Sequence, residues 1–197
     1  NNDFEHLLIL SGDQLYRMDF RDIIAAHIEK EAELTVATIP VGRELAKAFG
    51  IMHNDGAGRI SRFVEKPGTP ELLDSLRLSD AQVAEQGLEA GGDHYLASMG
   101  IYIFKRATLT ELLDNEMTDF GKHIIPRAIE THRVFSHVYQ GYWEDIGTIR
   151  SFFEANLDMV RTVPKFAFFE METPIYTRPR FMPASKIKGA AIDQAVI

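Results

Sequence analysis

The chain has 197 residues, of which 45% are hydrophobic and 25% are charged, a composition that is ordinary for a globular protein with one substantial core. Its formal net charge of −8 argues against nucleic acid or an anionic membrane as the main partner, because both require a basic face. The lack of cysteine excludes disulfides, thiolate metal sites and cysteine nucleophiles, and no apolar run reaches the length of a membrane span.

Both ends of the sequence are abrupt. It opens just before an apolar run without an initiator methionine, and it stops inside another apolar stretch. We therefore expect a fragment of a longer protein. No basic-then-apolar signal pattern stands at its start, so the expected location is the cytoplasm.

The first part of the chain predicts a strand, a helix and a second strand. Residues 6–10 (HLLIL) are continuously apolar, which is typical of a strand buried on both faces of a parallel sheet. Apolar residues then recur at helical spacing over residues 20–27, behind Asp19 as an N-cap. Residues 34–40 are again β-branched and apolar. This order predicts a βαβ unit whose two strands form a parallel pair with a right-handed crossover.

The middle of the chain predicts a hairpin and a long strand. Two short apolar runs flank turn residues 54–56, and the second run ends at Lys66. Residues 68–94 are polar, with one short helix expected over 70–76. Residues 94–104 predict another buried strand.

Helices and one further strand are expected in the remainder. Residues 107–116 and 119–132 favour helices, the second interrupted by its proline, and residues 133–140 favour a strand. Thr148 then caps a helix with one apolar face, and the chain beyond Pro164 is proline-rich and resembles a linker. That apolar face consists of Ile149, Phe152, Phe153, Leu157 and Val160.

Two aspartates stand beyond predicted strands, where open α/β sheets bind their ligands. Taken singly, Asp13 is explained as a turn residue after Gly12, and Asp145 as a cap at the entry to a helix. Taken together, the two carboxylates suit Mg²⁺, which prefers one or two carboxylates, waters and substrate phosphates. An acidic chain that binds phosphates would need such an ion, so the sequence predicts a Mg²⁺ site at Asp13 and Asp145.

Further polar residues stand at or within the predicted strands. Lys66 is either an exposed lysine at a strand end or a point charge for a phosphate. Glu65 and Ser98 would accept hydrogen bonds from sugar hydroxyls, and Gly100 would let a ligand approach the backbone. The chain has no Walker A motif and no G-x-S-x-G, and its "DFG" at Asp119 lacks every other kinase motif.

Six segments carry a resemblance when they are taken together in this order. They are LILSGDQLYRMDF, FGIM…GRISRFVEKP, YLASMGIYIF, DFGKHIIPRAI, GYWEDIGTIRSFFEANLDM and PIYTRPRFMPASK. The combination closely resembles the glucose-1-phosphate adenylyltransferases (ADP-glucose pyrophosphorylases). The resemblance implies an α/β, Rossmann-like nucleotidyltransferase fold with a mostly parallel sheet over residues 1–163. It also implies a linker over 164–184 and the start of a left-handed β-helix over 185–197.

The same resemblance implies a reaction and its site. ATP and glucose 1-phosphate would give ADP-glucose and pyrophosphate, with Mg²⁺ as cofactor, in glycogen or starch biosynthesis. By motif position, the resemblance assigns the metal to Asp13 and Asp145, and contacts with the sugar phosphate to Gly50, Glu65, Lys66 and Ser98. It further implies a tetramer regulated by metabolites, in the cytoplasm or, for a plant source, in a plastid.

The sequence departs from the family pattern at its start. The family's N-terminal glycine-rich loop, which cradles the nucleotide triphosphate, has no counterpart here, so we expect the isolated chain to be inactive. Two alternatives stay open: another sugar-1-phosphate nucleotidyltransferase with a different base, or a non-catalytic regulatory subunit. The presence of Asp13, Lys66 and Asp145 argues against the regulatory subunit, because a lost activity would free those positions to change.

Overall fold

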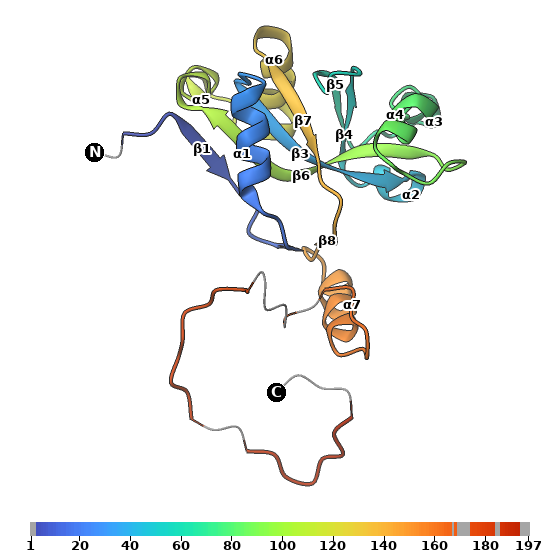
Figure 1. The fold of residues 1–197 in the computed structure, drawn as a ribbon, viewed down its shortest axis with the longest axis vertical. Coiled ribbons are helices and arrows are strands. Elements are labelled where there is room, and N and C mark those ends of the chain that lie inside the picture. Colours follow the sequence, from blue (N-terminus) through green and yellow to red (C-terminus); the bar gives the residue numbers. More distant parts are fainter. Residues whose placement is uncertain (1–2, 167, 169–173, 184–185, 194–197) are drawn as a thin grey trace. The chain divides into compact units, whose positions relative to one another are not determined.

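The chain forms two compact units, which are described separately (Figure 1). The computed structural model describes residues 3–166, 168, 174–183 and 186–193. The larger unit comprises residues 1–12 and 18–141, and the smaller unit comprises residues 13–17 and 142–197. The short stretch 13–17 therefore leaves the larger unit and returns to it, while the rest of the smaller unit follows residue 141.

A six-stranded mixed sheet forms the centre of the larger unit. Its order is β5-β4-β6-β3-β7, and β1 also pairs with β6 (Figure 1). The strands are β1 (His6–Ile9), β3 (Leu34–Gly42), β4 (Gly50–Asn54), β5 (Ile60–Glu65), β6 (His94–Lys105) and β7 (Val134–Val138). This arrangement confirms the predicted α/β class, the hairpin and the long strand.

The strand directions explain why the sheet is mixed. β6 is antiparallel to β1, β3 and β4, whereas β3 and β7 are parallel. Four strands thus run one way, and β5 and β6 run the other way. The predicted pairing inside the βαβ unit is wrong, because β6 lies between β1 and β3 and pairs with both. At Ile103 of β6, for example, Leu8 of β1 stands opposite on one edge and Thr35 of β3 on the other.

The helices of the larger unit begin where local sequence signals place them. They are α1 (Phe20–Glu29), α2 (Arg43–Ala46), α3 (Pro70–Asp74), α4 (Asp80–Glu85), α5 (Arg106–Leu113), the π-helical turn η1 (Phe120–Ile124) and α6 (Ile125–Thr131). The Asp19 carboxylate accepts from the Arg21 N–H and caps α1 as predicted. Helix α4 was not predicted, although Ser79 and Gln82 form a capping box that the sequence already contains.

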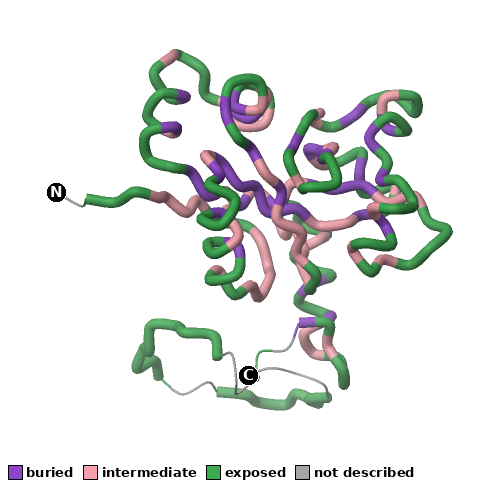
Figure 2. The backbone as a smooth tube through the Cα atoms, turned by 45° about the horizontal axis from the view of Figure 1, so that its top comes forward, coloured by how far each residue is buried: buried purple, intermediate pink, exposed green. Residues whose placement is uncertain are grey.

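The core of the larger unit covers both faces of the sheet. Along β6, Leu96 belongs to one buried cluster, whereas Tyr95 and Ala97 belong to another. This division follows from the alternation of side chains along a strand. Figure 2 shows the buried residues concentrated along the sheet and on the inner sides of the helices. The polar residues at the strand ends are therefore held on a rigid frame.

The smaller unit is built on a two-stranded ribbon and one helix. β2 (Gln14–Tyr16) pairs antiparallel with β8 (Trp143–Asp145), and α7 (Ile149–Met159) follows. The Trp143 indole N–H donates to the Gln14 side chain at 3.2 Å, which links the two strands further. Phe166 is buried in this unit, where its ring lies beside Tyr142 and beneath the Arg17 guanidinium.

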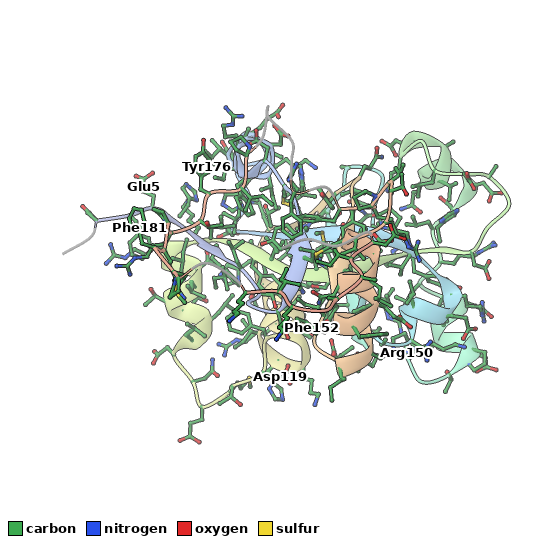
Figure 3. All side chains as sticks on the ribbon, turned by 90° about the horizontal axis from the view of Figure 1, so that it is seen from below. Glu5, Asp119, Arg150, Phe152, Tyr176 and Phe181 are labelled. Atoms are coloured by element: carbon green, nitrogen blue, oxygen red, sulfur yellow. The ribbon has the colours of Figure 1, made fainter. Side chains whose placement is uncertain are left out.

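Helix α7 has the predicted apolar face, but most of this face is exposed. Ile149 is 92% exposed, and Phe152 on the same helix is 55% exposed. Figure 3 labels Phe152 on α7. The buried positions of α7 are instead Ala155 and Asp158. None of the described helices combines the length and the apolar character that a membrane crossing requires.

The predicted linker and β-helix lie in the C-terminal part of the chain. The described residues 174–183 and 186–193 contain neither helix nor strand. Residues 167, 169–173 and 184 of the predicted linker, and residues 185 and 194–197 of the predicted β-helix start, lie outside the described residues. The β-helix start and the domain limits at 163 and 184 therefore stay predictions.

Candidate functional site

The two aspartates of the predicted metal site lie side by side in the smaller unit. Asp13 directly precedes β2, and Asp145 is the last residue of β8, where it pairs with Gln14. The Ile146 N–H donates to the Asp13 carbonyl at 3.1 Å and extends this ladder. The β2–β8 ribbon thus places two residues that are far apart in the sequence at one end of the same pair of strands.

Gly147 shows how closely the two carboxylates approach. A Cβ atom on this glycine would lie 2.9 Å from Asp145 Oδ1 and 3.2 Å from Asp13 Oδ2. The two oxygens are separated by no more than the sum of these distances, which is well under the roughly 10 Å that would exclude a shared ion. A side chain at this position would fill the space that both carboxylates face.

The chemistry of this pair fits a magnesium ion. Two carboxylates match the number that Mg²⁺ takes from proteins, since waters and phosphates complete its shell. The Gly147 N–H donates to Asp145 Oδ1 at 2.8 Å and orients that carboxylate. Within the described part of the chain, no cluster of three or more histidine or carboxylate side chains has a metal-binding arrangement. Asp145 is also not the helix cap, because Thr148 caps α7.

A second group of site residues lies in the larger unit, around Glu65. Gly50 and Glu65 are direct partners in the β4–β5 pair. A Cβ atom on Gly50 would lie 2.8 Å from Glu65 Oε2, and one on Gly121 would lie 2.9 Å from the same oxygen. The carboxylate therefore rests between two glycines. A side chain at Gly121 would displace Glu65, and one at Gly50 would meet both Glu65 and the Phe63 ring, which would lie 2.3 Å away.

Ser98 joins this group through Tyr102, which stands on the same face of β6. Burial raises the pKa of the Tyr102 hydroxyl, a hydrogen bond with Ser98 opposes that shift, and the charges of Glu65 and Asp119 raise the pKa further. The Phe120 ring stacks on Tyr102 with centroids 5.7 Å apart. Hydroxyls and carboxylates from β5, β6 and the start of η1 thus surround one small region.

Tyr102 and Asp119 were not predicted as site residues. Tyr102 stands four residues after Ser98 on a strand, so their shared face was a usable signal. Asp119 belongs to the "DFG" string that has no other kinase motif beside it. Its carboxylate accepts from the Lys122 N–H at 2.9 Å and caps η1, and its charge acts on the Tyr102 hydroxyl.

Lys66 lies directly after β5 and lines a cavity that does not include Glu65. Its φ of 47° is in the left-handed region, which is uncommon for a residue other than glycine. Its side chain is exposed and lines a cavity of about 440 Å³ together with Arg43 and Lys47. Among the described residues, the Lys66 ammonium makes no hydrogen bond or ion pair with Glu65 or Ser98.

The residues around the predicted metal pair have structural roles. Trp143 binds Gln14 across the ribbon, as described above. Burial raises the pKa of Glu144, Lys165 opposes the shift, and the neighbouring Asp145 raises it further.

A comparison with protein families finds a match over most of the chain. The model of the nucleotidyl transferase family matches residues 1–162. This range includes the Asp13–Asp145 pair, the group around Glu65 and the cationic cavity at Lys66.

Proposed function

Because the chain belongs to the nucleotidyl transferase family, we propose that it transfers an adenylyl group from ATP to glucose 1-phosphate, giving ADP-glucose and pyrophosphate. The observation that carries this proposal is the pair of carboxylates, Asp13 and Asp145, which face one point beside Gly147. The choice of ATP and of glucose is supported by the motifs that resemble glucose-1-phosphate adenylyltransferases.

The proposed chemistry needs positioning and charge neutralisation more than proton transfer. A phosphate oxygen of the sugar phosphate attacks the α-phosphorus of the nucleotide in line, and pyrophosphate leaves. This oxygen is already an anion, so no general base is required. A Mg²⁺ ion held by Asp13 and Asp145 would supply positive charge to the phosphates. The carboxylates, hydroxyls and lysine of the candidate site are groups that can position the substrates and neutralise their charge.

The group around Glu65 would orient the sugar. Carboxylates accept hydrogen bonds from sugar hydroxyls, and the Glu65 carboxylate is already confined between Gly50 and Gly121. The Ser98 and Tyr102 hydroxyls can each donate and accept a hydrogen bond, so they would bind further hydroxyls of the sugar. Lys66 would neutralise the sugar phosphate. A site of this kind rejects a sugar that lacks one of the hydroxyls, because buried polar partners are then left unpaired.

The experiment that tests the proposal measures nucleotide-sugar formation by the natural full-length protein. Glucose 1-phosphate is offered with ATP, UTP, dTTP, CTP or GTP. We expect product with ATP and Mg²⁺, and a loss of roughly 100-fold or more in kcat for Asp145→Asn and for Asp13→Asn. Glu144→Gln removes a neighbouring carboxylate of the same ribbon and should change kcat by less than about 3-fold.

Other results would replace the proposal with its alternatives. Turnover with another nucleotide only would identify a sugar-1-phosphate nucleotidyltransferase of different base specificity. No turnover with any nucleotide, from a folded protein, would favour the regulatory subunit. Full activity of Asp145→Asn would remove the carboxylate pair from the mechanism.

A further inference from the structure

The β2–β8 ribbon, which carries both aspartates of the candidate metal site, is very short. Its strands are joined by three residue pairs. An isolated two-stranded ribbon is marginally stable at best in water. The distance between Asp13 and Asp145, at one end of this ribbon, therefore depends on what holds the two strands together.

The opposite end of the ribbon is closed by one aromatic side chain, Phe166. Arg17 directly follows β2, and Tyr142 directly precedes β8. The Phe166 ring centroid lies 5.9 Å from the centroid of Tyr142 and 5.4 Å from the Arg17 guanidinium carbon. Phe166 is buried, and burial also raises the pKa of the Tyr142 hydroxyl. One side chain thus contacts the residues that flank both strands, and we call this contact the aromatic clasp.

Asp158 brings Phe166 back to the ribbon. It is a buried residue of α7, and an aspartate is rarely buried unless it has partners. Its carboxylate accepts from the Lys165 N–H at 2.9 Å and lies 3.2 Å from the Arg161 guanidinium. The bond to Lys165 turns the chain back after α7, so that Phe166, the next residue, meets the ribbon.

The aromatic clasp and the carboxylate pair lie at opposite ends of the same two strands. A strand rises about 3.3 Å per residue, so Asp13 and Arg17 are on the order of 13 Å apart along β2. At this separation Phe166 acts on the carboxylates through the ribbon. If the clasp opens, the strands separate at that end, and three residue pairs no longer fix the distance between Asp13 and Asp145.

We propose that Phe166, anchored by Asp158, is a positioning residue for the metal pair of Asp13 and Asp145. This inference rests on the proposed function, and it adds the segment after α7 to the parts of the chain that determine metal binding. Mg²⁺ requires near-octahedral geometry with oxygens at about 2.0–2.1 Å, so a small displacement of either carboxylate weakens its binding.

Titration of the natural full-length protein with Mn²⁺, followed by the electron paramagnetic resonance signal of the free ion, tests the inference. Mn²⁺ replaces Mg²⁺ because both take oxygen ligands in octahedral sites. Phe166→Ala should raise the Kd for Mn²⁺ about 10-fold, the lower end of the loss when groups that orient metal ligands are removed. Phe166→Leu keeps an apolar side chain in the clasp and should stay within about 3-fold of the natural protein.

Variants of α7 provide the second measurement and the control. Asp158→Ala should raise the Kd as much as Phe166→Ala does, and the double variant should bind no more weakly than either alone, because both changes open one contact. The matched control is Phe153→Ala, which removes an exposed phenylalanine of the same unit. Its Kd should stay within about 2-fold.

The outcomes separate this inference from the proposed function. If Phe166→Ala lowers the number of Mn²⁺ sites per chain but leaves their Kd unchanged, Phe166 only supports folding, and the inference is wrong. If Asp145→Asn abolishes Mn²⁺ binding while Phe166→Ala binds as the natural protein does, the metal pair stands and the positioning role is wrong. If Asp145→Asn itself binds Mn²⁺ as tightly as the natural protein, the metal pair of the proposed function fails together with this inference.

Discussion

At the scale of single residues, two glycines determine where the Glu65 carboxylate can lie. A Cβ on Gly121 would stand 2.9 Å from Glu65 Oε2, so Gly121→Ala must displace that carboxylate. We expect KM for glucose 1-phosphate to rise about 10-fold, with a smaller change in kcat, because ground-state and transition-state contacts are lost together. Steady-state kinetics with the sugar phosphate varied measure this effect.

Gly56 provides the control for this prediction. A Cβ there would meet no atom within 4 Å, so Gly56→Ala should leave KM unchanged. An unaltered KM in Gly121→Ala as well would mean that Glu65 does not hold the sugar.

His27 makes stability depend on pH. Its ring is 1% exposed, with Nδ1 at 2.7 Å from Thr35 Oγ1 and Nε2 at 3.1 Å from His6 Nδ1. Burial, with smaller effects of His6 and Lys105, lowers its pKa from 6.5 to about 4. Between pH 6.5 and about 4, the unfolded chain therefore binds a proton at His27, whereas the folded chain does not. The stabilisation is complete above pH 6.5, and about 3 kcal/mol is lost as the pH falls to about 4.

Urea unfolding at several pH values between 7.5 and 4 measures the predicted loss. His27→Gln should flatten this part of the profile, although it costs some stability at neutral pH. His123→Gln, a change at an exposed histidine, should leave the slope as it is. A slope that is the same in His27→Gln and in the unaltered chain would contradict the assignment.

At the scale of elements, α7 depends on its cap because much of its apolar face is exposed. The Thr148 hydroxyl accepts from the Ser151 N–H at 3.0 Å, and the Ser151 hydroxyl accepts from the Thr148 N–H at 3.2 Å. Thr148→Ala should therefore lower the free energy of unfolding by about 1 kcal/mol, whereas Thr148→Ser should keep most of it. Chemical denaturation measures the difference.

Thr110 of α5 serves as the comparison for the cap. It is exposed inside a helix and bonds back to the Arg106 carbonyl at 3.0 Å. Thr110→Ala should change stability by less than about 0.5 kcal/mol. If both alanine variants behave alike, the cap contributes nothing specific to α7.

At the scale of the whole molecule, substrate binding should stabilise the fold. A ligand that binds only the folded state at 100 times its Kd contributes about 2.7 kcal/mol, which raises the melting temperature. We expect glucose 1-phosphate to produce this rise and glucose 6-phosphate at the same concentration to produce much less, since its phosphate is on C6 instead of C1. Glu65→Gln should reduce the rise. Equal shifts with both sugar phosphates would show that only a phosphate is recognised.

The sequence by itself determined the features that depend on neighbours along the chain. The cap at Asp19, the cap at Thr148 and the turn of the β4–β5 hairpin involve hydrogen bonds within a few residues, so residue type and spacing predict them. The approach of Asp13 and Asp145 was also predicted, from the expectation that strand ends of one α/β sheet gather ligands, although the separate β2–β8 ribbon is what brings them together.

Only the tertiary structure decided which distant segments meet. An apolar run indicates that a strand is buried but does not indicate which strand it pairs with. The position of β6 between β1 and β3 was therefore not predicted. An amphipathic pattern states which side of α7 is apolar but not what covers it. Tyr102 and Asp119 approach Glu65, and Arg43 shares a cavity with Lys66, through contacts between separate strands and turns. Hydrogen bonds and packing across the sheet determine these contacts, and the spacing of residues along the chain does not predict them.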